Sequence, residues 1–154
     1  NDFTLTCLAN LALAGKHEPI GDEKKSTANP NNRGLVLRLD YGHSTFLFPG
    51  DIEKDYEEYI LDKEELLKAD VLLMPHHGLR SSGSARFMEN VSPRYCIVST
   101  GRKVPFPPPQ VSGSGTEIFS TAHHGTVFFH TDGKTITAQP YRPTNGSENA
   151  MAAN

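Results

Sequence analysis

An aspartate and two adjacent histidines follow two consecutive apolar segments of this 154-residue chain. Residues 44–49 end on Gly50-Asp51, and residues 71–74 end on Pro75-His76-His77-Gly78. The intervening residues have helical character, and their number allows a right-handed crossover that makes the two strands parallel neighbours. Because α/β sheets bind ligands at the carboxyl ends of their strands, we expect the carboxylate and an imidazole to meet there. This set of donors suits zinc, manganese or iron.

Each of these residues also has a purely structural interpretation. Gly-Asp at the end of a strand is a common turn, and Asp51 could equally be the N-cap of a helix that follows it. A single histidine is more often a structural residue than a ligand. Core packing does not require an aspartate, a crossover helix and His76-His77-Gly78 in this order, and the combination therefore favours a site.

A small polar loop follows the histidines. Arg80, Ser81, Ser82 and Ser84 lie in it, and their hydroxyl and backbone N–H groups could hold a phosphate oxygen or could simply face solvent. A second His-His-Gly string, residues 123–125, has flanks that predict a hairpin turn with solvent-exposed histidines.

Composition predicts one globular domain with a hydrophobic core, at 36% hydrophobic and 21% charged residues. The net charge of −3 argues against a nucleic-acid-binding module driven by bulk charge. Residues 51–70 carry nine acids and three bases, whereas residues 80–103 carry five bases and one acid. The basic stretch either attracts an anionic substrate or is an ordinary solvated face. Cys7 and Cys96 lie in apolar runs, which predicts buried thiols.

Hydrophobic periodicity and turn residues predict a mixed α/β (α+β) domain. Polar residues 15–33 indicate an exposed loop, proline-rich residues 101–115 exclude regular structure, and residues 143–154 read as a disordered tail. Helices are expected at 52–68 and 85–90. Strands are expected at 3–8, 34–40, 44–49, 71–74, 95–99, 117–122, 126–130 and 135–139.

Across about residues 30–140 the chain resembles the metallo-β-lactamase-like domain of the ComEC family of DNA-internalisation competence proteins. The resemblance implies an αββα sandwich with two divalent metal ions, zinc or manganese, between its sheets. It implies that Asp51 bridges the ions and that His77, or as second choice His76, supplies a late ligand. Asp51 and His77 are thus the candidate catalytic residues. The runs that carry the resemblance are 32–42, 45–53, 67–78, 81–84, 91–99 and 126–133.

The chain departs from the family pattern in three places. It has no His-x-His-x-Asp-His string, it has Ala9 or Asn10 where a histidine often ends a strand, and residues 104–109 lack the usual Gly-His-Pro. We therefore expect residues 1–142 to form mainly the C-terminal half of the domain, with one mixed sheet and outer helices. The chain also begins with a non-Met residue already in a strand, which predicts a piece of a longer protein.

Three functions are consistent with these residues. The first is part of a metal-dependent phosphodiesterase or nuclease of a bacterial DNA-uptake protein, inactive as this fragment. It would be a soluble extracytoplasmic domain of an inner-membrane protein, without membrane contact of its own. Its expected partners are DNA, the remainder of the parent protein and, as an alternative, a second copy. The second function is a degenerate, metal-free module that binds DNA or a partner protein, and the third is an esterase of the same superfamily.

Overall fold

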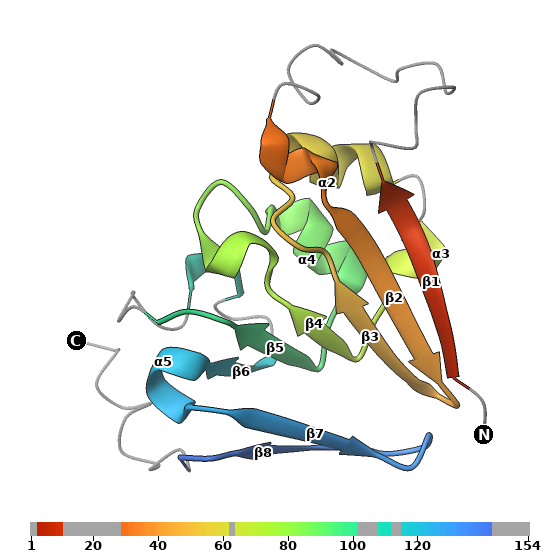
Figure 1. Cartoon of the computed structure of the whole chain (residues 1–154), viewed down its shortest axis with the longest axis vertical. Helices are drawn as coiled ribbons and strands as arrows, with labels where there is room; N and C mark the ends of the chain where they lie inside the picture. Colours follow the sequence, from red (N-terminus) through yellow and green to blue (C-terminus); the bar gives the residue numbers. More distant parts are fainter. Residues whose placement is uncertain (1–2, 11–28, 62–63, 102–107, 112–114, 143–154) are drawn as a thin grey trace.

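The computed structural model describes residues 3–10, 29–61, 64–101, 108–111 and 115–142 (Figure 1). The predicted tail, residues 143–154, and most of the predicted loop at 15–33 lie outside these ranges. The end of that loop is described, and there Pro30 and Arg33 are exposed as predicted, but the segment is not an irregular loop. Pro30–Arg33 forms a 3-10 helix in which Asn32 is buried, because its side chain bonds to the backbone of a distant segment.

Six strands form one mixed sheet in chain order (Figure 1). The first three pair antiparallel, and the third to sixth pair parallel. This mixed sheet confirms the expected α+β class. The strands are β1 (Phe3–Asn10), β2 (Leu35–Tyr41), β3 (Ser44–Phe48), β4 (Val71–Leu73), β5 (Tyr95–Val98) and β6 (Glu117–Ser120). A separate antiparallel pair is formed by β7 (Val127–Thr131) and β8 (Ile136–Pro140).

The predicted helix over 52–68 is two shorter helices, α2 (Lys54–Ile60) and α3 (Glu64–Leu67). Asp51 does not cap α2, because the extended N-cap position is occupied by Glu53. The predicted helix at 85–90 is confirmed as α4 (Ala85–Val91). The strand predicted at 117–122 is shorter than expected, because residues from Thr121 onward turn into α5 (Thr121–His124). Further 3-10 helices are Pro75–Gly78 and Pro109–Val111.

The main core lies between the sheet and helices α2, α3 and α4. Every second residue of a strand faces the same side, so an apolar row forms on this face. The helices cover it with their own apolar stripes, as the expected outer helices should. The strand residues of this core include Val36, Leu47, Leu72, Cys96 and Val98, and the helical ones Tyr56, Ile60, Leu67, Phe87, Met88 and Val91.

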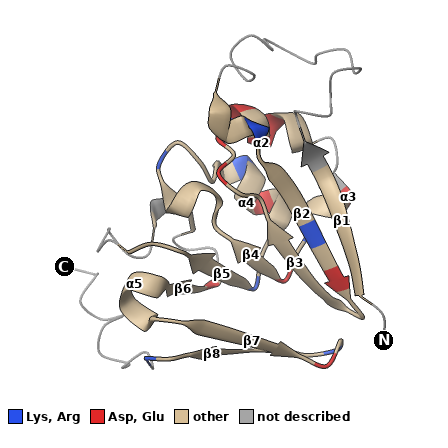
Figure 2. Ribbon diagram, in the orientation of Figure 1, with Lys and Arg blue, Asp and Glu red and all other residues tan. Residues whose placement is uncertain are grey.

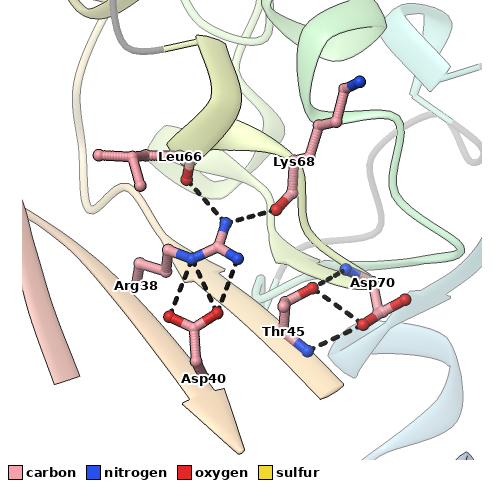
Figure 3. Close-up of polar contacts among 6 residues, drawn as sticks. All are labelled: Arg38, Asp40, Thr45, Leu66, Lys68 and Asp70. Carbon is pink, nitrogen blue, oxygen red and sulfur yellow. Dashed lines mark hydrogen bonds and ion pairs between the residues drawn. The ribbon is translucent and has the colours of Figure 1, made fainter. Parts of the chain in front are cut away.

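Polar contacts hold the crossover from β3 to β4 in place (Figure 3). The Thr45 backbone N–H and hydroxyl each donate to Asp70 Oδ2 at 2.8 Å, and the Asp70 N–H donates to Thr45 Oγ1 at 2.8 Å. Asp70 directly precedes β4, so these bonds fix where β4 begins beside β3. The Arg38 guanidinium pairs with Asp40 and donates to two backbone carbonyls at the end of α3.

The opposite face of the sheet is apolar and only partly covered. The β7–β8 pair packs on it through a second cluster centred on Tyr95, Phe119 and Ile136. Figure 2 shows no charged residue on β3, β4 or β5. Beside β7 an open groove of about 650 Å³ remains. Its lining residues are Phe3, Leu39, Tyr41, Phe46, Phe48, Val71, Leu73, Ile97, Val127, Phe129 and Thr131.

We expect this groove to bind a hydrophobic dye such as anilinonaphthalene sulfonate, because exposed apolar patches of this kind are uncommon on monomeric proteins. Phe48→Ser, in the groove, should lower dye fluorescence. Leu66→Ser is the matched control, since Leu66 is 45% exposed but lies on α3, outside the groove. Gel filtration showing a clean monomer that binds no dye would contradict an accessible apolar face.

The two cysteines should differ in reactivity. Cys96 is buried as predicted, and burial raises the pKa of its thiol to about 12. Cys7 is exposed, so the prediction that it is buried is wrong. Because the thiolate is the reactive form, a thiol reagent at about pH 8 should modify Cys7 in the folded chain and Cys96 only after denaturant is added. Mass spectrometry of peptides would locate the label, and rapid labelling of Cys96 in the folded chain would contradict its burial.

Candidate functional site

Three neighbouring parallel strands end at one edge of the sheet. Asp51 follows β3, the 3-10 helix Pro75–Gly78 follows β4, and Ser99 follows β5. The His76 N–H donates to the Gly50 carbonyl at 3.0 Å, which ties the first two of these segments together. The structure therefore brings together the aspartate and the histidines that the sequence singled out.

His77 is oriented by a backbone carbonyl. Its Nδ1 lies 2.7 Å from the Ser99 carbonyl oxygen. Because a carbonyl oxygen only accepts, Nδ1 is the donor, and in the neutral imidazole Nε2 carries the lone pair. That Nε2 lies 3.9 Å from Asp51 Oδ1, and both side chains are about half exposed. An imidazole that donates one N–H to a backbone carbonyl while its other nitrogen stays available is typical of histidine metal ligands.

His76 has a different environment. Its Nδ1 lies 3.4 Å from Glu53 Oε1 and 3.4 Å from Ser81 Oγ. Its side chain is 19% exposed, compared with 57% for His77. The two imidazoles therefore point to different partners, although they are adjacent in sequence.

Both histidines adopt left-handed backbone conformations, with φ of 47° at His76 and 56° at His77. A non-glycine residue in this region costs on the order of 1–3 kcal/mol and persists only where the surrounding contacts hold it. Here the contacts to Gly50, Glu53 and Ser99 do so. Both neighbouring side chains contact polar partners at this edge.

A buried carboxylate accepts hydrogen bonds from the backbone of the serine loop, residues 81–84. Glu57 on α2 is completely buried and accepts the Gly83 N–H at 2.5 Å and the Ser84 N–H at 2.7 Å. Ser84 is also the N-cap of α4, where its hydroxyl accepts the Phe87 N–H. Ser82 is buried.

Ser81, by contrast, reaches His76, and Arg80 is exposed on the same loop. The phosphate-holding role of Arg80, Ser81, Ser82 and Ser84 stays a prediction.

The donors available to a metal ion are few. Asp51 Oδ1 and His77 Nε2 are close enough to share one ion and are chemically suited to it. Among the residues that the structure describes, however, no group of three or more His, Cys, Asp or Glu could hold an ion. Catalytic zinc sites use three protein ligands and an open position, so the pair fits part of such a site.

The second His-His-Gly string lies elsewhere and has another environment. His124 is buried on α5, and its Nδ1 accepts the Ser120 N–H at 2.9 Å. Its ring packs edge-on against Phe119. The prediction of solvent-exposed hairpin histidines is therefore wrong for His124, because residues 121–124 form a short helix that folds back on β6.

The sequence patterns did not indicate Glu53, Glu57 or Ser99 as part of this region. Their contacts join segments 22 to 27 residues apart, as in Asn31 with Glu53 and Ser84 with Glu57. The one available signal was the spacing of Glu53 two residues after Asp51, which by itself reads as an acidic helix start.

Comparison with known proteins finds relatives among competence proteins, while no family model matches the chain. The chain is 26% identical over 135 residues to ComE operon protein 3 of Bacillus subtilis, which covers 84% of this chain and 17% of that protein. It is 32% identical over 85 residues to competence protein ComA of Neisseria gonorrhoeae, covering 54% and 12%. It is 34% identical over 86 residues to recombination protein 2 of Haemophilus influenzae, covering 56% and 11%.

The chain thus spans less than a fifth of the length of these relatives. The similarity supports the competence part of the expected resemblance, and the metallo-β-lactamase-like domain stays a prediction. Among the described helices, none is both long and apolar enough to cross a membrane.

Glu57→Gln should destabilise the folded chain by about 2–3 kcal/mol, because the Gly83 and Ser84 N–H groups each donate to a different oxygen of Glu57 and the amide NH2 that replaces one oxygen cannot accept. The matched control is Glu58→Gln. Glu58 is 60% exposed and pairs with Arg86 on the surface, so its loss should cost at most about 1 kcal/mol. Urea unfolding followed by circular dichroism measures both values, and equal stability of the two variants would contradict the role of Glu57.

Proposed function

We propose that this chain is part of a DNA-uptake protein and that its Asp51–His77 edge belongs to a metal-dependent phosphodiesterase or nuclease site. The observation that carries the proposal is the 3.9 Å separation of Asp51 Oδ1 and His77 Nε2, with His77 Nδ1 engaged by the Ser99 carbonyl. The similarity to proteins named for competence and recombination makes DNA the favoured substrate and partner.

Each residue has a proposed task at this site. Asp51 and His77 would hold a divalent ion, zinc or manganese. Such an ion, when bound, would supply Lewis-acid stabilisation of the negative charge that develops on a phosphoryl group. Ser99 keeps His77 in the required orientation, and the exposed Arg80 and Ser81 lie where a phosphate oxygen could be held. The remaining ligands would come from the parent protein outside this chain.

A metal-free binding module is the second candidate. It is supported by the absence, among the described residues, of three ligands that could surround one ion. In that case Asp51 and His77 would be a surface pair, and the chain would bind DNA or a partner protein without cleaving it. Because the two candidates share the same fold, only the response to metal separates them.

The isolated chain should bind Mn²⁺ or Zn²⁺ weakly, because water competes well where the protein supplies two ligands. His77→Ala and Asp51→Ala should abolish this binding in calorimetric titrations. His130→Ala is the control, since His130 is exposed on β7, far along the chain from the edge. Undiminished binding in both site variants would contradict the proposed ligands, and no binding by the unmodified chain would favour the metal-free module.

The isolated chain should also show no turnover of bis-p-nitrophenyl phosphate or DNA above buffer with either ion added. In the parent protein, by contrast, Asp51→Ala should abolish metal-dependent DNA cleavage. Cleavage by the isolated chain that Asp51→Ala removes would show that its own residues complete the site.

A further inference from the structure

The antiparallel pair β7–β8 has an outer face that the core does not use. Side chains alternate along both strands, so Val127, Phe129 and Ile136 join the second cluster and their neighbours in sequence point outward. The Tyr141 N–H donates to the Thr126 carbonyl at 2.7 Å, which extends the pairing beyond β8 and keeps Tyr141 on the outer side. The ribbon face consists of the exposed residues Phe128, His130, Thr137, Gln139 and Tyr141.

Three aromatic rings lie on the ribbon face. The exposed fraction is 48% for Phe128 and 75% for Tyr141. The rings of Phe128 and His130 are nearly parallel, with centroids 6.5 Å apart and an angle of 22° between their planes. Phe128 pairs with Gln139 and His130 with Thr137 across the two strands, so an amide and a hydroxyl stand beside the rings.

The ribbon face differs in chemistry from the apolar groove on the sheet. The groove is lined by leucine, isoleucine and valine as well as by aromatic residues, whereas none of the five residues of the ribbon face is aliphatic. Aromatic rings exposed on a sheet among hydrogen-bonding side chains are typical of surfaces on which unpaired nucleic-acid bases stack.

The charges around the ribbon face suit an anionic partner. No charged residue lies within β7 or β8, and the exposed residues Lys134 and Arg142 lie just beyond the two ends of β8 (Figure 2). The one acid of residues 126–142 is Asp132, whose Oδ1 accepts the Lys134 and Thr135 N–H groups at 2.8 Å each. Two bases against one acid give this segment a charge of +1, in a chain whose net charge is −3.

We propose that the ribbon face binds single-stranded DNA, with bases stacked on Phe128, His130 and Tyr141 and phosphates near Lys134 and Arg142. A single strand is required because a duplex hides the flat faces of its bases. Stacking contributes to affinity whatever the base sequence, so this surface does not depend on the bulk positive charge that the chain lacks. The choice of DNA rests on the proposed function, whereas the stacking surface stands on the geometry of the ribbon.

Phe128→Trp tests the proposal in the metal-free 154-residue chain, which has no tryptophan of its own. A base that stacks on the indole quenches its fluorescence. Titration with an oligothymidylate of about 15 nucleotides, in low-salt buffer with EDTA, should therefore give saturable quenching. The same strand paired with oligoadenylate should bind at least about fivefold more weakly. Phe3→Trp is the matched control and should show no quenching, since Phe3 is 70% exposed but lies on β1 of the other sheet.

Fluorescence anisotropy of a labelled oligothymidylate separates stacking from simple apolar docking. Phe128→Leu and Tyr141→Leu keep an apolar side chain but remove the flat ring, so each should weaken binding by roughly fivefold or more. Phe128→Tyr retains the ring and should bind as the unmodified chain does. Phe3→Leu is the control on β1 and should have no effect. Circular dichroism checks that each of these surface variants is folded.

The absence of saturable quenching would overturn the proposal. Undiminished binding by folded Phe128→Leu and Tyr141→Leu would also overturn it, because a face that accepts leucine would be an apolar surface for a protein partner. Tighter binding of an oligouridylate of equal length would overturn the choice of DNA. Because EDTA removes divalent ions, failure of the metal titrations would leave oligonucleotide binding intact, and failure of oligonucleotide binding would leave the Asp51–His77 edge intact.

Discussion

The parallel pairing of β3, β4 and β5 is the constraint on which the site depends. Parallel strands end at the same edge of a sheet, so three segments that are distant in sequence meet there. The register of β4 is set near its start, where Asp70 is hydrogen-bonded to Thr45. In this register Leu72 pairs with Leu47 on β3 and with Cys96 on β5. If β4 shifted by one residue, its core side chains would face the groove. The histidines would also lose their hydrogen bonds to the Gly50 and Ser99 carbonyls.

Glu53 and Glu57 belong to the same segment but have different structural roles. Glu57 is completely buried, and two backbone N–H groups compensate for its desolvation, so it stabilises the loop after the histidines. Glu53 is a quarter exposed and contacts His76, and asparagines of a separate segment hold it. The acidic residues of 51–70 therefore do not all belong to a solvated face, because these two side chains have specific internal partners.

The strands could be predicted from sequence, because alternating or continuous apolar residues directly express burial on a sheet. The meeting of Asp51 with His77 followed from the same pattern, since it requires only strand order and a crossover. The helix at 52–68 was predicted too long, because an apolar stripe does not reveal that α2 begins only at Lys54 and ends at Ile60.

What could not be predicted are the tertiary contacts that hold these residues in place. The buried Asn32, the strained backbone at His76 and the Ser99 carbonyl acquire their roles only when separate segments are packed together. Local propensity favours an exposed asparagine and a right-handed histidine backbone. Tertiary contacts override both preferences, and they do so at the edge that carries the candidate ligands.

The apolar groove and the two-ligand edge belong to the same region of the sheet. Phe48 ends β3 and Leu73 ends β4, both line the groove, and each stands three residues before Asp51 or His76. Polypeptide that covered the groove would thus end beside the carboxylate and the imidazoles. Under the proposed function, one additional segment of the parent protein would bury the apolar face and supply further ligands.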